Sequence, residues 1–249
     1  RHLSIDFPTA QAVVTVVPLE EATGGADLAE LLGRTAGLQM KRFGGWGAPA
    51  VPSIRGSSGA QVVVMVDGIP LVDAQNGTVD LSTLPLERFG SAEIYRGLQP
   101  THFGGPGGAG SINLISRAGG AAGSSLRLFT GSYGDLGGRW LHGVQSADGS
   151  RSGVVLLHGR RIDNRFTFLD HNQTFHELAD DRVRLRVNAD FAEWGGTLGG
   201  RWNTDRWRLQ MAAGGYRKTG GRPGPLGYPS PDARLQVTRL DGRLSAESA

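Results

Sequence analysis

The stretch Asp67–Arg117 reads DGIPLVDAQNGTVDLSTLPLERFGSAEIYRGLQPTHFGGPGGAGSINLISR and separates two kinds of sequence. It joins short apolar strands by turns and by many glycines. Upstream lie continuous apolar runs, such as Val62–Val66, which are typical of buried strands. Downstream, charged and apolar residues alternate, as in Arg182–Phe191, which is typical of strands with one polar face. The stretch is therefore a boundary between two architectures.

The residues before this boundary predict a small α+β domain. Ala12–Val17 reads as a short buried strand, and Ala26–Leu32 places its leucines on one helical face. Asp67-Gly68 is a strong signal for a tight turn after a strand. A helical turn at Asp80–Leu84 and a strand at Ala92–Arg96 complete the domain, in which the sequence indicates no catalytic cluster.

Composition excludes several classes of protein. The 249 residues include 40 glycines and no cysteine, which favours turns over long helices and excludes disulfide bonds and thiolate metal sites. No run of about 18 apolar residues occurs, so a transmembrane helix is excluded, whereas a β-barrel is not. The start of the chain lacks the pattern of a secretory signal. We therefore expect either a cytoplasmic chain or one whose numbering starts after signal removal.

The charge pattern argues against nucleic-acid binding. Residues 1–120 have a net charge of −2 and residues 121–249 one of +5, so the basic excess lies in the second half. There the arginines occupy every other position, as Arg182, Arg184 and Arg186 do. Such spacing lines one face of a strand and does not build a basic patch. We expect no nucleic-acid partner.

The sequence offers little support for enzymatic or metal chemistry. Gly105–Gly110 matches the G-x-G-x-x-G pattern of dinucleotide loops, but a strand-like segment follows it and not the required helix. An NAD-dependent enzyme is therefore disfavoured. His171 and His176 lie beside acidic residues in a loop, where such side chains are usually solvated. We expect no enzyme, no cofactor and no metal site.

Four motifs, in order, resemble the plug domain of TonB-dependent outer-membrane receptors. They are an Ile-Arg-Gly step, a Val-Asp-Gly-Ile-Pro strand and turn, a Glu-Ile-x-x-Gly strand and a Phe-Gly step followed by Gly-Ser-Ile-Asn-Leu-Ile. The signature residues in these motifs are Ile54, Arg55, Gly56, Asp67, Gly68, Glu93, Gly97, Gly104 and Asn113. The resemblance covers residues 12–118, with matching order and spacing.

The chain departs from this family at two positions. The family usually has an arginine two residues before the strand glutamate, which is thought to join a charge cluster between plug and barrel wall, but here that residue is Ser91. The tyrosine of the family's Tyr-Gly step is Phe103. A TonB-contacting box is expected ahead of the plug. Leu3–Phe7 is a poor candidate for it, so a position upstream of Arg1 stays open.

The second half predicts antiparallel strands with one apolar face. In Arg182–Phe191 the apolar residues from Val183 to Phe191 share one face and the charged residues the other. A soluble sandwich would bury that face against a second sheet, whereas an outer-membrane barrel would turn it to lipid. Strands of about 10 residues, aromatic residues near strand ends and one long interruption at Asp163–Asp181 favour the barrel.

We therefore expect two domains: a plug at residues 1–120 and the N-terminal part of a transmembrane β-barrel at residues 121–249. The second part accounts for six or seven strands, whereas such transporters have about 22. Because an open sheet in lipid leaves backbone groups unpaired, the chain is expected to continue beyond Ala249 in a larger receptor.

The resemblance implies a receptor in the bacterial outer membrane that imports a scarce, bulky ligand, such as a ferric siderophore or a corrinoid. The spacing of its motifs is most similar to the vitamin B12 receptor branch. Its partners would be a TonB-type energy-transducing protein of the inner membrane and outer-membrane lipid. Ligand contacts are expected from the outward loops of the plug. The residues expected there are Arg42, Phe43, Trp46, Gln75 and Asn76.

The alternative from another class is a soluble β-rich binding or adhesion protein. Alternation of polar and apolar residues by itself is compatible with both. Fractionation discriminates between them, because only the soluble protein would be recovered without detergent.

Overall fold

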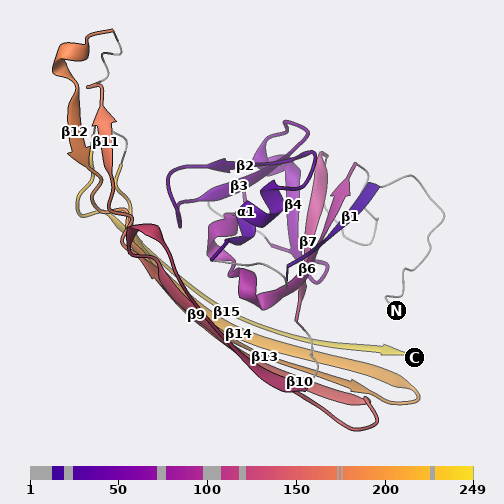
Figure 1. Cartoon of the computed structure of the whole chain (residues 1–249). Coiled ribbons are helices and arrows are strands. Elements are labelled where there is room, and N and C mark those ends of the chain that lie inside the picture. Colours follow the sequence, from indigo (N-terminus) through magenta and orange to yellow (C-terminus); the bar gives the residue numbers. More distant parts are fainter. Residues whose placement is uncertain are drawn as a thin grey trace.

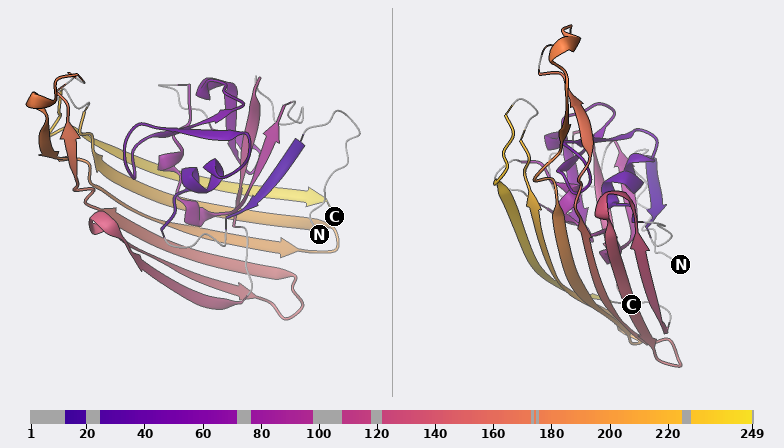
Figure 2. Two further views of the ribbon diagram at one scale, coloured as in Figure 1. Left: turned by 45° about the horizontal axis from the view of Figure 1, so that its top comes forward. Right: turned by 60° about the vertical axis from the view of Figure 1, so that its left-hand side comes forward.

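Two sheets of different shape divide the chain (Figure 1). The computed structural model describes residues 13–19, 25–71, 77–97, 108–117, 122–172, 174, 176–224 and 228–248. We call the described part of the chain up to residue 117 the N-terminal domain, and it contains a short five-stranded sheet. The second half contains a long, curved six-stranded sheet, which we call the wall. The N-terminal domain lies against the concave face of the wall (Figure 2).

The sheet of the N-terminal domain has the strand order β1-β6-β7-β4-β5. Strands β4 and β7 are parallel, and the other neighbours are antiparallel. The strands are β1 (Val13–Pro18), β4 (Val62–Val66), β5 (Ile69–Pro70), β6 (Phe89–Arg96) and β7 (Gly110–Ser116). The central strand β7 is buried at nearly every residue, so both of its faces are covered. The runs that read as strands in the sequence lie within β1, β4 and β6.

A single α-helix and three short 3-10 helices complete the described part of this domain. The helix α1 (Leu28–Gly33) begins after Asp27, whose carboxylate accepts a hydrogen bond from the Glu30 N–H at 2.7 Å. This cap explains why the helix starts two residues later than its apolar pattern predicts. The 3-10 helices are η1 (Gly59–Gln61), η2 (Leu81–Thr83) and η3 (Leu86–Arg88).

The apolar core of the N-terminal domain forms between α1 and the sheet. Its largest fully buried side chains are at most 1% exposed and include Leu28, Leu32, Ile54, Phe89, Ile94, Ile112 and Leu114. Each buried residue of this cluster comes from the N-terminal domain and none from the wall. The domain therefore has a core of its own, separate from the wall.

A small hairpin was not expected from the sequence. Strands β2 (Leu38–Arg42) and β3 (Ala50–Ile54) pair antiparallel, and the loop between them is residues 43–49. The hairpin is hard to recognise in the sequence for two reasons. Glycines and prolines surround the loop, and β2 and β3 are only five residues long. We call residues 43–49 the β2–β3 loop.

The wall is a continuous antiparallel sheet in the order β15-β14-β13-β10-β9-β8. Its strands are β8 (Gly123–Thr130), β9 (Leu136–Gln145), β10 (Arg151–Ile162), β13 (Phe191–Asn203), β14 (Trp207–Gly221) and β15 (Arg234–Ser248). A short 3-10 helix, η5 (Ser132–Gly134), connects β8 and β9. Among the described residues the sheet is open, because β8 and β15 each have one neighbour.

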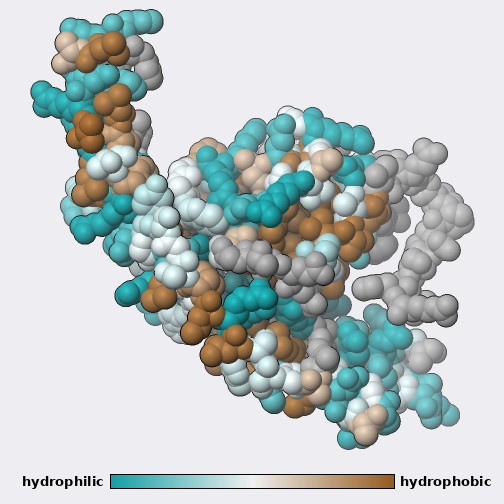
Figure 3. Space-filling view, viewed as in Figure 1, coloured by the Kyte–Doolittle hydropathy of each residue, from teal (hydrophilic) through white to brown (hydrophobic). Residues whose placement is uncertain are grey.

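The two faces of the wall differ in polarity. On the convex face, large apolar side chains are exposed, as Leu157, Leu198 and Leu240 are. On the concave face, alternate residues such as Leu156 and Tyr216 are buried under the N-terminal domain. Figure 3 shows apolar side chains along the outer edge of the wall. Within the described residues, no helix has the length and apolarity needed to traverse a bilayer.

The alternation in Arg182–Phe191 predicted a single strand, but the segment does not form one. Residues 182–185 form β12 (Arg182–Leu185), which pairs with β11 (Thr167–Asp170) in a hairpin that stands off from the wall (Figure 1). This hairpin also contains η6 (Leu178–Asp180). The wall resumes only at Phe191, because Asn188 has a φ of 54° and interrupts the extended backbone. Its amide donates to the carbonyls of Ser230 and Ala233, each at 2.8 Å.

Gly110 provides a test of how β6 and β7 pack. Its φ is 143°, and a Cβ there would lie 2.3 Å from the carbonyl oxygen of Tyr95. Gly97 has a φ of 115° but open space around the same position. We expect Gly97→Ala to lose about 1–3 kcal/mol of unfolding free energy from backbone strain alone. Gly110→Ala should lose clearly more, because the clash adds to the strain. Thermal unfolding measures both, and equal losses would contradict the predicted clash.

Candidate functional site

Four of the signature residues meet in one hydrogen-bond network. The Asn113 Oδ1 atom accepts from the Gly68 N–H at 2.8 Å, and its Nδ2 donates to Glu93 Oε2 at 3.0 Å. Asp67 Oδ1 accepts from the Ser116 N–H at 2.9 Å. These bonds fix the turn after β4 onto β6 and β7. The signature at these positions is therefore explained by the structure of the domain itself.

Tyr95 extends the network on strand β6. Its hydroxyl donates to Glu93 Oε2 at 3.0 Å, and burial together with the charge of Glu93 raises the pKa of Tyr95. The hydroxyl therefore keeps its proton and acts as a donor to the carboxylate. Glu93 is thus held by two donors, Tyr95 of its own strand β6 and Asn113 of the neighbouring strand β7.

The remaining signature residues mark turns. Ile54 is fully buried at the end of β3, and Arg55 and Gly56 follow it with φ values of 52° and 79°. The Arg55 N–H donates to the Gly37 carbonyl at 3.1 Å, which ties this turn to the start of β2. Gly97 ends β6 with a φ of 115°. Gly104 lies outside the described residues.

Of the five expected ligand contacts, Phe43 and Trp46 lie in the β2–β3 loop, and Arg42 is the last residue of β2 directly before it. Arg42 forms two hydrogen bonds with Asp27, of which Nη1–Oδ2 measures 2.7 Å, and these bonds raise the pKa of Arg42. Its charge is therefore already compensated. Phe43 is 70% exposed. Gln75 and Asn76 lie outside the described residues, so their place relative to this loop is not described.

Trp46 of the same loop faces the wall. The Cζ atoms of Arg42 and Arg160 lie 5.6 Å and 4.8 Å from the Trp46 ring centroid. The Trp46 carbonyl accepts a hydrogen bond from Asn164 Nδ2 at 2.9 Å. The neighbouring Gly47 leaves no room for a side chain, because a Cβ would lie 2.2 Å from the Phe191 ring. Trp46 thus holds the loop against the wall, while Phe43 projects from it.

Arg160 on β10 is the main wall residue at this loop. Its guanidinium binds both carboxylate oxygens of Asp135 at 2.8 Å and donates to the Gly25 carbonyl at 2.6 Å. The Phe129 ring centroid lies 5.4 Å away. The sequence reasoning missed this residue. The sequence around it gives no signal of alternation, because Val154–Leu157 is a continuous apolar run and Arg160 and Arg161 are adjacent.

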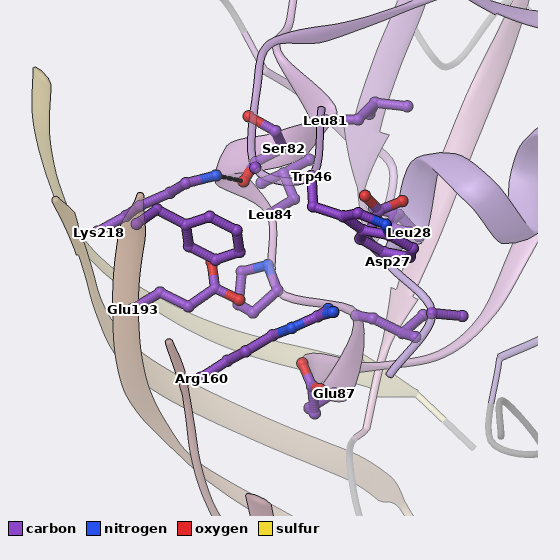
Figure 4. Close-up of a pocket in the computed structure, with 15 residues that line it drawn as sticks. Asp27, Leu28, Trp46, Leu81, Ser82, Leu84, Glu87, Arg160, Glu193 and Lys218 are labelled. Carbon is purple, nitrogen blue, oxygen red and sulfur yellow. Dashed lines mark hydrogen bonds between the residues drawn. The ribbon is translucent and has the colours of Figure 1, made fainter. Parts of the chain in front are cut away.

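A small polar cavity lies between the two parts of the chain (Figure 4). It measures about 30 Å³, which is room for about one water molecule. Figure 4 shows Arg160, Glu193 and Lys218 reaching from the wall toward Glu87 and Ser82 of the N-terminal domain. Lys218 Nζ donates to the Ser82 carbonyl at 2.8 Å, and the Tyr216 hydroxyl donates to Glu193 Oε2 at 2.8 Å.

These groups are arranged to hold two surfaces together. The bonds across the cavity join charged wall side chains to the N-terminal domain, and Lys218 also lies 4.8 Å from the Phe191 ring centroid. In the part of the chain that the structure describes, no group of three His, Cys, Asp or Glu side chains is placed to bind a metal ion. His171 Nδ1 lies 3.0 Å from Asp181 Oδ1, and His176 is exposed.

Glu87 should make stability depend on pH. Burial raises the pKa of its carboxyl group, and the charges of Arg139, Arg160 and Arg117 oppose this rise only in part. The folded protein then binds the proton more tightly than the unfolded chain does, so stability falls as pH rises through the interval between the usual and the raised pKa. Glu87→Gln should remove this component.

Thermal unfolding of the wild type and of Glu87→Gln between pH 5 and 8 measures the effect. The stability difference between the two proteins should shift in favour of the variant as pH rises. Glu30→Gln, at the exposed ion pair with Arg34, is the control and should show no such trend. A pH-independent difference for Glu87→Gln would contradict the prediction.

Comparisons with known proteins agree with this arrangement. Residues 5–111 match the model of the TonB-dependent receptor plug domain. The vitamin B12 transporter BtuB of Vibrio cholerae is 39% identical over 98 residues, which are 39% of this chain and 16% of that protein. The chain thus spans only a small part of the curated relatives that it matches.

Solved structures show the same fold over most of the chain. The copper transporter OprC matches 94% of this chain and 34% of its own, with a TM-score of 0.68 and 16% identity. The ferric citrate transporter FecA, in its unliganded form, matches 86% of this chain and 32% of its own, with a TM-score of 0.59 and 17% identity. Residues 5–111 are therefore similar to the plug domain of TonB-dependent receptors, and the antiparallel strands that follow have the fold of the barrel strands in these solved structures.

Proposed function

We propose that the chain is the plug and the first wall strands of an outer-membrane receptor that imports a scarce, bulky ligand. The observation that carries this proposal is the position of the N-terminal domain against the concave face of the wall, whose convex face is apolar. A domain in that position closes the lumen of a barrel. It acts as a transporter part and not as an enzyme.

The convex face supports a place in a membrane. The outward-facing residues of β10 begin at Arg151 and end at Arg161. Between these two charged residues they include Val155 and Leu157. Ten residue steps of about 3.3 Å, tilted by about 40°, span close to the apolar band of about 25 Å of such barrels. At one end Arg151 lies 4.7 Å from the Trp202 ring centroid, an arrangement suited to a membrane interface.

The ligand class follows from what related proteins carry. BtuB is named for vitamin B12, and the structurally similar FecA for ferric citrate. We propose a corrinoid or a ferric siderophore, with first contacts at the β2–β3 loop. Arg42, Phe43 and Trp46, together with Gln75 and Asn76, remain the proposed ligand residues, and Phe43 is the most exposed of the three that the structure describes.

Energy would come from a TonB-type protein of the inner membrane. The strand β1 lies at the edge of its sheet, with β6 as its one neighbour, and Val14 and Val16 are exposed. The residues before Val13 lie outside the described residues. A pull on that segment would reach β1 first, and strand addition is the mode of binding that an extended segment favours.

Uptake by the full-length receptor tests the proposed function. Cells that depend on this receptor should accumulate labelled cyanocobalamin or a labelled ferric siderophore, and loss of the TonB-type protein should abolish accumulation. The receptor should also be recovered in the detergent-dependent outer-membrane fraction. Recovery in a soluble fraction, or accumulation that does not need the energy-transducing protein, would contradict the proposal.

Phe43→Ala should weaken ligand binding and leave the receptor in the outer-membrane fraction. Loss of one exposed aromatic contact is worth about 1–2 kcal/mol, so Kd should rise by about fivefold to thirtyfold. Equilibrium binding to the detergent-solubilised receptor measures this change. Leu126→Ala is a matched control, because Leu126 is 67% exposed on the convex face of the wall. An equal effect of both variants would refute a role of Phe43 in binding.

A further inference from the structure

Strand β15 presents alternating charges to the N-terminal domain. Arg239, Asp241 and Arg243 follow each other at every second residue, so they share the concave face. Two of them meet opposite charges of the N-terminal domain. Arg88 Nη1 lies 2.5 Å from Asp241 Oδ1, and its second terminal nitrogen binds the other carboxylate oxygen. Arg243 Nη1 lies 3.0 Å from Asp67 Oδ2.

Both ion pairs are largely shielded from solvent. The side chains of Arg88 and Asp67 are each 11% exposed, and their wall partners are about one-third exposed. Salt therefore screens these pairs less than it screens surface pairs. Removal of one partner would leave a charge in a poorly hydrated place, which costs more than the loss of an exposed pair.

The polarity of the two pairs is crossed. In one pair the N-terminal domain supplies the cation, and in the other it supplies the anion. If the domain slid along β15 by two residues, about 7 Å, the next side chains on that face would meet it. Arg88 would then face Arg239 or Arg243, and a shift that brings Asp67 to Asp241 would oppose two anions. Like charges would meet in either direction, so the observed register is favoured over its neighbours.

Arg88 also occupies a defined place in its own domain. It ends η3, and its Cζ atom lies 5.7 Å from the Phe89 ring centroid. The pairing of β6 with β7 shifts by one residue between Phe89 and Ser91. Ser91, where the family usually has an arginine, sits between Pro18 and Ile115 in the sheet. Its short side chain cannot make the two bonds that Arg88 makes.

We propose that Arg88 and Asp241, together with Asp67 and Arg243, form a crossed ion pair that sets the position of the plug along the wall. The role is one of positioning: none of the four residues needs to touch the ligand. The inference rests on the proposed closure of the lumen by the plug, but the contact itself is measurable without transport.

Charge reversal in the full-length receptor tests the pair. The variants are Arg88→Asp, Asp241→Arg and the combined swap, with Arg34→Asp at an exposed ion pair as the control. Hydrogen exchange of the amides next to the contact, in η3 and in the Asp67-Gly68 turn, reports loosening of the plug from the wall. We expect each single reversal to accelerate exchange at least tenfold, the swap to return it to within threefold of the wild type, and the control to leave it unchanged.

Several outcomes would overturn the proposal. Exchange in the swap as fast as in the single variants would do so, as would single reversals with no effect. If a reversal prevents accumulation of the receptor, Arg88→Lys and Asp241→Asn replace it, and additive effects of these two substitutions would count against a direct pair. Charge reversals of Asp67 and Arg243, made singly and together, test the second ion pair in the same way.

Permeation separates this inference from the proposed function. Cells with a single-reversal variant should become more sensitive to a bulky antibiotic that the intact outer membrane excludes, and the swap should restore resistance. Altered exchange without altered permeation would leave the ion pair in place as a structural contact but would overturn its role in closing the lumen. Absence of ligand uptake by the wild-type receptor would instead refute the proposed function and leave this inference untouched.

Discussion

The burial of charged side chains on the concave face of the wall is the constraint on which the structure depends. A charge removed from water needs a partner, since its desolvation costs several kcal/mol. Arg160 is paired with Asp135 of the wall and also donates to the Gly25 carbonyl, and Lys218 donates to the Ser82 carbonyl. These carbonyls lie outside the regular hydrogen bonding of the sheet, so they are free to accept. The N-terminal domain and the wall therefore satisfy each other's polar groups.

The same constraint makes the domain separable from the wall. Its apolar core, from Leu19 to Leu114, contains no wall residue. Many contacts across the boundary are hydrogen bonds, ion pairs and cation–π contacts, which water can replace at modest cost. A displacement of the domain would thus expose much polar surface, together with a few apolar side chains such as Leu156 and Phe191. An interface built from aliphatic side chains would resist such movement more strongly, because its exposure carries the full hydrophobic penalty.

The sequence predicted the elements better than the contacts between them. Four ordered motifs identified the N-terminal domain, and alternation identified the wall. Alternation failed at Arg182–Phe191, since one left-handed residue, Asn188, ends a strand without changing the polar pattern. The contact of Trp46 with Arg160 joins residues far apart in the chain, and no local pattern encodes it. Phe43 and Trp46 look alike in the sequence as loop aromatics, yet only one of them lies against the wall.

The β2–β3 loop places an exposed aromatic side chain and one that lies against the wall within a few residues of each other. Phe43 is exposed, while three residues later Trp46 is fixed by Arg160 and by Asn164. Asn164 is 3% exposed and also donates to the Ala189 carbonyl, at the base of the β11–β12 hairpin. A ligand that displaced Phe43 would therefore act on a loop already bonded to that base. Coupling between two sites requires a contiguous set of contacts with more than one arrangement, and here the set is short: one loop, one indole and one asparagine.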